Sequence, residues 1–478
     1  MMPQQQAWPM AEAVLELAVR AAAAPDPALA AAGNRTVERL RRPLCVAVVG
    51  RVSSGKSTLL NALLGRSVSP TAGGECTKVL YSFRHGMWDY AVAEPRDGSG
   101  DVPMDFEGTR LSTTIPLPAD RLRRVNVTLP ASLLQRVTLL DTPGLASTSV
   151  ETSAVTARML EDTSDAAADA DALLFCLNST LKDDEAAAVR TFRAARGGAR
   201  LTGGTAVGLL TKADQRTPER KTVWKEATES ARKMSAAHAE LFSEVLPVIG
   251  LLAETAASGA LREPHARALA ALAKEWNPDR SEIALASPEL FLELPGPVSR
   301  EGRGELVALL GTFGIGELLE ALRSDVPAHA AALTEVARAA SGLDAVTARL
   351  EVVLGNRADV LKAASALEDL LGRAQAAGDR TIYGQAQQLL DRAEMFPLRL
   401  QEMARQLAGG QVRPPAGMAE EAWLAVTVGL PRSTPAKAAQ RAGAWREWSA
   451  LADTSGRNVA RVMVRAWQLA THDNGGTR

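Results

Sequence analysis

An eight-residue phosphate-loop pattern restricts the fold of this 478-residue chain more than any other feature. Residues Gly50 to Ser57 read GRVSSGKS and match GxxxxGK[ST], a loop that joins a β-strand to an α-helix. An apolar run, Leu44 to Val49, precedes the loop, and a helical pattern, Thr58 to Leu64, follows it. Because both flanks are present, the sequence predicts a nucleotide site; a glycine turn with a solvated lysine would leave the flanks a coincidence.

The residue types of this loop suit phosphate groups and a Mg²⁺ ion. Backbone N–H groups of such a loop and of the following helix N-terminus point at the phosphates. Lys56 would neutralise charge on the β- and γ-phosphates, and the Ser57 hydroxyl would bind Mg²⁺. The predicted contacts of the nucleotide are Gly50, Ser53, Ser54, Gly55, Lys56, Ser57 and Thr58.

A second motif, Asp141-Thr142-Pro143-Gly144, directly follows the apolar run Val137 to Leu140. A carboxylate at this strand end reaches Mg²⁺, and we expect Asp141 to do so through a water. Gly144 is then the candidate sensor of the γ-phosphate. Taken alone the motif would be a strand-ending turn, but its position downstream of a phosphate loop favours the metal site.

A third motif, Thr211-Lys212-Ala213-Asp214, ends the apolar run Thr205 to Leu210 and matches [NT]KxD. Its aspartate can accept from guanine N1–H and the exocyclic amine, and adenine offers neither donor. Because charge-assisted hydrogen bonds are worth about 1.5–3 kcal/mol each, the pair favours GTP over ATP. The sequence therefore predicts a guanine site that also includes Thr211, Lys212 and Asp214.

A switch threonine is expected between the first two motifs, to close over Mg²⁺ and the γ-phosphate. The segment 71–77 offers Thr71 and Thr77. We favour Thr77 because it precedes an apolar run, and Gly73 and Gly74 supply the mobility that a switch needs. Thr71 remains the alternative, and the glycines could also form a plain β-turn.

The residue after Gly144 is Leu145, where Ras-like enzymes carry the glutamine that orients the attacking water. Hydrolysis must be organised differently here. Candidates are the Thr77 backbone, Ser53 or Ser54, a bound monovalent cation, or a group from a second protomer. The predicted catalytic residues are Lys56, Ser53, Thr77 and Gly144, and the predicted Mg²⁺ ligands are Ser57, Thr77 and, through water, Asp141.

Hydrophobic periodicity predicts an α/β domain followed by an all-α domain. From Leu44 to about Ile249, short apolar runs alternate with helical stretches, which indicates a mostly parallel sheet with helices on both faces. Beyond Leu251 the strand signal ends, and residues 343–367 carry one apolar stripe, which predicts a long helix or a helix pair. We expect N-terminal helices (1–42) that pack with the C-terminal bundle, a GTPase domain (43–275) and a helical neck (276–478).

Composition limits the partners and the compartment. A formal net charge of -1 gives no overall basic field, so we expect no nucleic-acid partner. The 3 cysteines are odd in number and form no CxxC pair, which favours a cytoplasmic protein without a disulfide framework. No run of about 18 uncharged apolar residues occurs, so any membrane contact is expected to be peripheral.

Together the motifs resemble those of bacterial dynamin-like GTPases: GKSTLLNALLG (55–65), PTAGGECTKV (70–79), DTPG and TKAD. More particular stretches resemble the shorter, isoniazid-inducible actinobacterial branch. They are FRHG (83–86), GLLAETA (250–256), GTFGI (311–315) and RADVLKAASALEDL (357–370). The likeness runs from about residue 40 to residue 371 and excludes the last hundred residues or so.

The resemblance implies a G domain joined to a helical neck and self-association through G domains across the nucleotide site. It also implies a second dynamin-like partner, membrane remodelling or repair, and a peripheral position at the inner face of the plasma membrane. Ser53 matches a serine that helps to hold a monovalent cation in the family. Val52 departs from the pattern, because eukaryotic members carry a catalytic glutamine there.

Two other functions remain open. One is a slow GTP-switched assembly protein, which Val52 and Leu145 favour because neither is the glutamine that other GTPases carry at that position. The other is a ribosome-associated GTPase, which would carry a basic or KH-like C-terminal domain; the neutral helical half argues against it.

Two local features also have alternatives. Trp423, Trp445, Trp448 and Trp467 could mark a helix on an anionic bilayer, but bundle core is the favoured interpretation. Gly250 to Glu254 is the candidate guanine-capping loop.

Overall fold

The computed structural model describes residues 9–69, 79–118, 120–143, 170–178, 180–194, 206–217, 219–238, 241–352, 358–408, 410, 412–427 and 430–471. The chain divides into two compact units. The first, called here the sheet unit, is Pro43–Phe192 with Ala206–Gly355. The second, the helical unit, is Met1–Arg42, Arg193–Thr205 and Asn356–Arg478.

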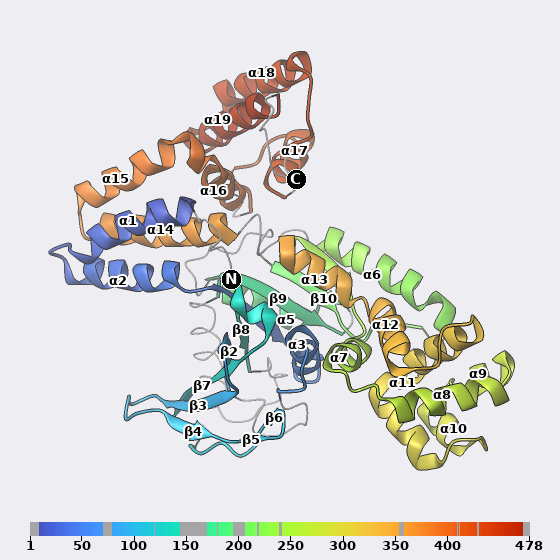
Figure 1. Ribbon diagram of the computed structural model, residues 1–478. Coiled ribbons are helices and arrows are strands. Elements are labelled where there is room, and N and C mark those ends of the chain that lie inside the picture. Colours follow the sequence, from blue (N-terminus) through green and yellow to red (C-terminus); the bar gives the residue numbers. More distant parts are fainter. Residues whose placement is uncertain are drawn as a thin grey trace. The chain divides into compact units, whose positions relative to one another are not determined.

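Within the described part of the sheet unit, nine strands form one sheet, in the order β11-β10-β9-β1-β8-β2-β7-β3-β4 (Figure 1). One half is parallel throughout: β1 (Leu44–Gly50), β8 (Val137–Asp141), β9 (Ala172–Leu177), β10 (Ala206–Leu210) and β11 (Glu244–Pro247). Every residue of β1, β8, β9 and β10 is buried, as their uninterrupted apolar runs predict for strands covered on both faces. The predicted, mostly parallel α/β sheet is confirmed.

The other half of the sheet mixes parallel and antiparallel strands. Of these strands, the sequence predicted only β2 (Tyr81–His85). This half adds β3 (Tyr90–Pro95), β4 (Val102–Met104) and β7 (Leu122–Leu129). β2 is antiparallel to β8 and parallel to β7, and β3 is antiparallel to both β7 and β4. A small separate pair is formed by β5 (Phe106–Glu107) and β6 (Arg110–Leu111). β7 alternates buried and partly exposed residues, the pattern of a strand with one covered face.

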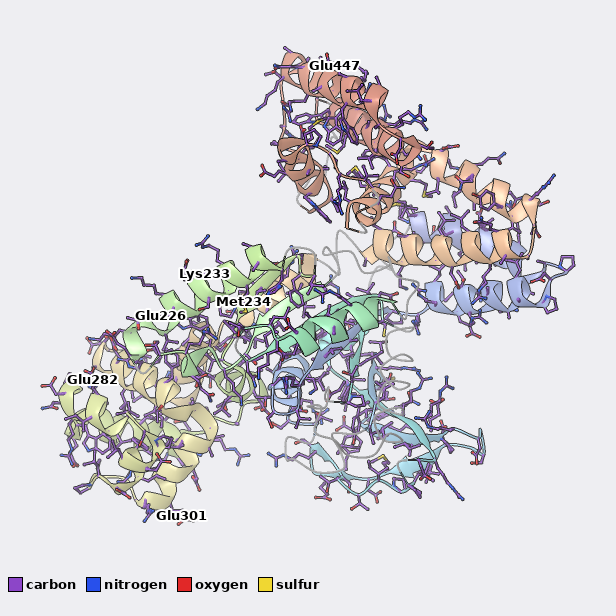
Figure 2. All side chains as sticks on the ribbon, turned by 180° about the vertical axis from the view of Figure 1, so that it is seen from behind. Glu226, Lys233, Met234, Glu282, Glu301 and Glu447 are labelled. Atoms are coloured by element: carbon purple, nitrogen blue, oxygen red, sulfur yellow. The ribbon has the colours of Figure 1, made fainter. Side chains whose placement is uncertain are left out.

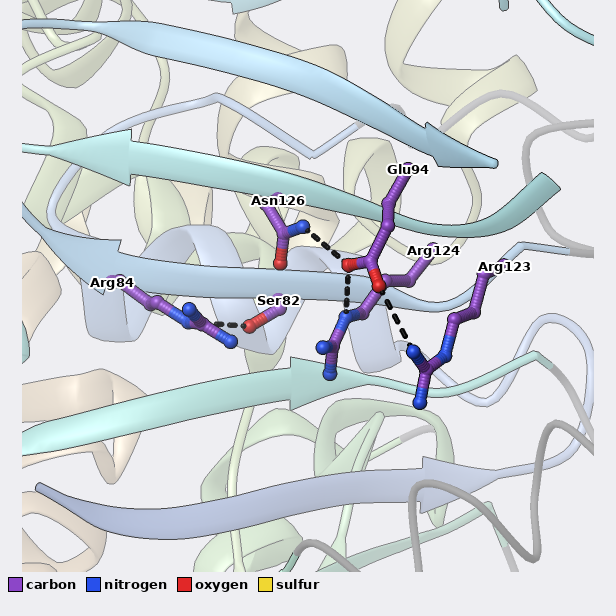
Figure 3. Close-up of polar contacts among 6 residues, drawn as sticks. All are labelled: Ser82, Arg84, Glu94, Arg123, Arg124 and Asn126. Atoms are coloured by element: carbon purple, nitrogen blue, oxygen red, sulfur yellow. Dashed lines mark hydrogen bonds and ion pairs between the residues drawn. The ribbon is translucent and has the colours of Figure 1, made fainter. Parts of the chain in front are cut away.

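Polar side chains connect the mixed strands (Figure 3). The Glu94 carboxylate accepts from Arg123 Nη1 at 3.1 Å, Arg124 Nε at 2.7 Å and Asn126 Nδ2 at 2.8 Å. Burial by itself would raise the pKa of Glu94, but the Arg124 and Asn126 donors lower that pKa below its usual value. These contacts fix β3 against β7, and each partly exposed ion pair is worth at most about 1 kcal/mol.

Helices of the sheet unit continue well past the last strand. They are α3 (Lys56–Leu64), α5 (Asp183–Ala194), α6 (Val223–Ala237), α7 (Gly250–Ser258), α8 (Glu263–Glu275), α9 (Pro278–Ala284), α10 (Pro288–Glu293), α11 (Arg300–Arg323), α12 (Ala330–Ser341) and α13 (Leu343–Val352). On α6, Glu226 and Lys233 are exposed, whereas Met234 is buried (Figure 2). This compact unit extends beyond residue 275. The boundary predicted there, between the GTPase domain and the helical neck, stays a prediction.

The helical unit combines both ends of the described chain. Its helices are α1 (Pro9–Ala22), α2 (Pro27–Arg41), α14 (Ala358–Ala376), α15 (Arg380–Asp391), α16 (Phe396–Ala408), α17 (Ala416–Thr427), α18 (Pro435–Leu451) and α19 (Thr454–Leu469). One core joins α1 and α2 to α14, α15 and α16, and a second joins residues of α16 to α19. The stripe expected over residues 343–367 falls on two helices, α13 and α14, and their apolar faces enter different cores: Leu343 and Leu350 are buried in the sheet unit and Leu367 in the helical unit.

Tryptophans of the C-terminal helices lie in the second core. Trp445 and Trp467 are buried, and Trp423 and Trp448 pack against the same cluster. The Trp445 indole donates to Glu421 Oε2 at 3.0 Å, and Arg441 pairs with the same carboxylate. The bundle-core interpretation holds, and the buried indoles of Trp445 and Trp467 do not face a bilayer. No helix in the described ranges combines the length and hydrophobicity that a bilayer span requires.

Candidate nucleotide-binding site

The phosphate loop lies between β1 and α3, and close contacts fix its backbone. A Cβ atom on Gly50 would come within 2.7 Å of Cys176 O and of Ser54 Oγ, so only glycine fits. Gly55 caps α3 with φ 84°, in the left-handed region that glycine tolerates. Ser53 adopts φ 62°, which is uncommon for a residue with a side chain. The sequence-predicted loop is thus present with a tightly specified backbone.

Lys56 lies folded across the loop. Its Nζ donates to Gly50 O at 3.2 Å and to Arg51 O at 3.0 Å. The side chain is buried, so its charge is concentrated at the loop instead of being solvated. A phosphate would offer this ammonium group a stronger, charged acceptor than two carbonyl oxygens.

The loop is held by two residues that end neighbouring strands. The Thr211 hydroxyl, at the end of β10, lies 2.6 Å from Ser54 O and 3.0 Å from Leu177 O. Asn178, at the end of β9, donates from Nδ2 to Ser53 O at 3.4 Å. The buried Thr211 side chain braces the loop, and its predicted contact with GTP stays a prediction. Asn178 was not anticipated, although a polar residue at the carboxyl end of a buried strand is a recognisable signal.

Asp214 and Lys212 follow on the same edge of the sheet. Lys212 has φ 53°, and Asp214 lies in a short 3₁₀ turn, Ala213–Gln215. Burial raises the pKa of Asp214, and a backbone N–H donor and the Lys212 charge offset only part of that effect. A desolvated carboxylate of this kind gains strongly from added donors, which is what a guanine edge supplies.

Asp141 ends β8 next to the phosphate loop. Ser69 Oγ donates to its Oδ2 at 3.2 Å, while Oδ1 is buried and has no hydrogen-bond partner among the described residues. Burial raises the pKa of Asp141 to about 6, although the Lys56 charge and the Ser69 and Ser57 hydroxyls act in the opposite direction. A free carboxylate oxygen beside the Ser57 hydroxyl fits a hydrated Mg²⁺, whose preferred ligands are oxygens.

Several predicted residues cannot be placed. Thr71, Thr77, Gly144 and Leu145 lie outside the described residues, so the switch threonine and the γ-phosphate sensor stay predictions. Val52 is described and is 50% exposed at the loop surface.

The expected guanine-capping loop is wrong. Residues Gly250 to Glu254 form the first turns of α7, and only Val248 and Ile249 connect that helix to β11. From this helix the Glu254 carboxylate accepts from Asn61 Nδ2 of α3 at 2.9 Å. The apolar run to Ile249 hid this boundary because it extends past the end of β11 at Pro247 and leads directly into the helix at Gly250.

Comparison with known proteins agrees with the site. Residues 46–186 match the Dynamin family. The isoniazid-induced protein IniC of Mycobacterium tuberculosis is 31% identical over 344 residues, which cover 70% of this chain and 68% of that protein. The chain belongs to the bacterial dynamin-like GTPases. The resemblance inferred from the motifs is confirmed, and guanine-nucleotide binding is a property of this family.

Two further matches are more limited. Dynamin-like protein 2 of Campylobacter jejuni is 34% identical over 100 residues, covering 21% of this chain and 16% of that protein. A solved structure of an oligomerised bacterial dynamin pair, described as sensing and tethering membranes, covers 96% of this chain and 73% of its own at 11% identity, with a TM-score of 0.36. A likeness this weak supports no conclusion about how this dynamin-like GTPase assembles.

Proposed function

We propose that this dynamin-like protein binds GTP with Mg²⁺ and hydrolyses it, coupling the pairing of G domains to assembly and to membrane remodelling or maintenance. The observation that carries the proposal is the Asp141 carboxylate, which lies beside the phosphate loop and the Ser57 hydroxyl and whose buried Oδ1 has no partner in the part of the chain that the structure describes. A second dynamin-like protein is the proposed partner, and contact with lipid would be peripheral at the inner face of the plasma membrane.

The chain's own groups divide the chemical work. Lys56, now bound to two loop carbonyls, would turn to the β- and γ-phosphates. Ser57 and Asp141 would hold Mg²⁺, which when bound neutralises charge that develops on the phosphates. Asp214 would select guanine through two donors of the base edge. The Thr77 backbone and Gly144 would position the attacking water.

A second protomer would complete the site. Ser53 is the proposed contact for a monovalent cation; it is exposed and has a strained φ of 62°. Asn178 stabilises that conformation through Ser53 O. G-domain pairing across this face would then exclude water from the site and would supply catalysis that a single chain lacks.

The alternative function is a slow GTP-switched assembly protein with little turnover of its own. Val52 favours it, because an aliphatic side chain that is 50% exposed at this loop position cannot orient a water molecule. In that case GTP would gate binding to the partner, and hydrolysis would need a group from the partner.

The test is GTP hydrolysis measured against protein concentration, with and without liposomes that contain phosphatidylglycerol. Lys56→Ala serves as the blank, since it removes the cation that the phosphates require. We expect specific activity to rise with protein concentration, because pairing completes the site. A slow rate that is independent of both concentration and lipid would overturn assembly-stimulated hydrolysis and favour the switch.

A further inference from the structure

A buried asparagine on α3 holds the segment that leads toward the predicted switch. Asn61 is fully buried, and its Oδ1 accepts from Val68 N at 3.0 Å and from Ser69 N at 2.8 Å. Its Nδ2 donates to Ser69 O at 3.2 Å. Because one side chain binds both the N–H and the C=O of Ser69, it fixes the position of that residue's backbone.

Glu254 of α7 completes the support from the other side. Its Oε1 accepts from Asn61 Nδ2 and from Ser67 Oγ, each at 2.9 Å. The Asn61 amide therefore uses both of its hydrogens and cannot rotate without breaking several bonds. Burial raises the pKa of Glu254, and the two donors lower it in part.

Ser69 transmits this arrangement to the nucleotide site. Its hydroxyl donates to Asp141 Oδ2 at 3.2 Å, which leaves Oδ1 buried and without a partner among the described residues. A carboxylate held by one oxygen in this way presents the other in a defined direction. Among the described residues, no side-chain hydrogen bond of Ser69, Asn61 or Glu254 reaches the phosphate loop or the TKAD residues, so these three residues act through Asp141.

We propose that Ser69, fixed by Asn61 and Glu254, is a positioning residue that orients Asp141 so that Oδ1 is the oxygen available to a Mg²⁺-bound water. The proposal rests on the proposed function to the extent that Mg²⁺ accompanies the nucleotide. The proposed role connects α7, which follows the last strand, to the Asp141 carboxylate through hydrogen bonds. Loss of such an outer-shell partner typically costs about 10- to 100-fold in metal affinity.

The experiment is a Mg²⁺ titration of fluorescent GDP release from the full chain, which needs no hydrolysis. For Ser69→Ala we expect the Mg²⁺ concentration at half-maximal effect to rise about tenfold or more, while GDP affinity in EDTA stays within about twofold of the wild type. Ser69→Thr keeps the hydroxyl and should restore the wild-type midpoint.

Two Glu254 variants test the same proposal independently, in case Ser69→Ala fails to fold. Glu254→Gln retains the acceptor oxygen for Asn61 and Ser67, so its Mg²⁺ midpoint should match the wild type. Glu254→Ala removes that oxygen and should shift the midpoint in the same direction as Ser69→Ala.

The possible failures are distinguishable. A wild-type chain whose GDP release ignores Mg²⁺ would contradict the proposed function itself. A Mg²⁺-dependent wild type with unchanged midpoints in Ser69→Ala and Glu254→Ala would overturn only the positioning role.

Discussion

Single residues at the nucleotide site are held in energetically unfavourable states when no ligand is bound. Within the described ranges, Asp141 is buried with one unpaired oxygen and the Ser54 hydroxyl is buried without a partner, and Ser53 has a positive φ. Each costs free energy of folding that a bound metal or nucleotide would offset. Such features are expected at functional sites, where stability is given up for binding.

Replacement of Asp141 by Asn is predicted to stabilise the ligand-free protein at neutral and alkaline pH. The folded pKa of about 6 lies above the ordinary 3.8, so the stability that this carboxyl contributes is full below pH 4 and is lost as pH rises through 6. The difference corresponds to about 3 kcal/mol. Without Mg²⁺ and nucleotide, the thermal midpoint of Asp141→Asn should exceed that of the wild type at pH 8, and the gap should close toward pH 4.

The control for this prediction is Asp101→Asn, at an exposed position outside the site. Its thermal midpoint at pH 8 should stay close to that of the wild type. A midpoint of Asp141→Asn below that of the wild type at pH 8 would contradict a costly buried charge.

At the scale of elements, α11 depends on one glycine. The helix runs from Arg300 to Arg323 but is broken at Gly311, where φ is 62° and ψ is 174°. The Thr255 hydroxyl of α7 donates to Leu309 O, a carbonyl two residues before the break. This kink lies in the GTFGI stretch and fits α11 against α7 in a common core.

Gly311→Ala is predicted to lower the stability of the sheet unit by about 1–3 kcal/mol, because this backbone region is essentially restricted to glycine. Gly304→Ala, in the same helix with no atom near the added Cβ, should instead raise stability by up to about 1 kcal/mol. Denaturant unfolding of both variants measures the opposite signs. Equal effects of the two changes would show that the kink imposes no strain.

At the scale of the whole molecule, segments far apart in sequence form one unit. The Asp359 carboxylate of α14 accepts from Met10 N at 2.9 Å and from Ala11 N at 2.7 Å, at the start of α1. Lys362 Nζ donates to Leu40 O at 3.1 Å, at the end of α2. Both ends of the N-terminal helix pair are thus tied to α14, within the helical unit.

Asp359→Ala is predicted to loosen this attachment, because it leaves two amide groups of α1 without their acceptor. The cost is about 1–3 kcal/mol, so amide hydrogen exchange in residues 9–22 should become roughly 5- to 150-fold faster. Glu12→Ala, at an exposed position of α1, is the matched control and should leave exchange unchanged. Unaltered exchange in Asp359→Ala would mean that apolar packing alone holds the helix.

The sequence by itself determined the parallel half of the sheet and the motifs at its edge. Uninterrupted apolar runs identify β1, β8, β9 and β10, because strands buried on both faces cannot alternate. GxxxxGKS and TKAD are each formed by consecutive residues of a single short loop. Each motif can therefore be recognised from local sequence alone. The family membership follows from the same short segments.

Only the tertiary structure decided the remaining features, because they depend on residues distant in sequence. The alternating strand β7 is stabilised by pairing with β2 and β3. Its own alternating pattern is too weak to predict a strand. Thr211 proved to brace the phosphate loop, and Glu254 proved to lie on a helix that supports Asn61. The orientation of Asp141 likewise arises from Ser69, a contact between positions 72 residues apart that no local pattern encodes.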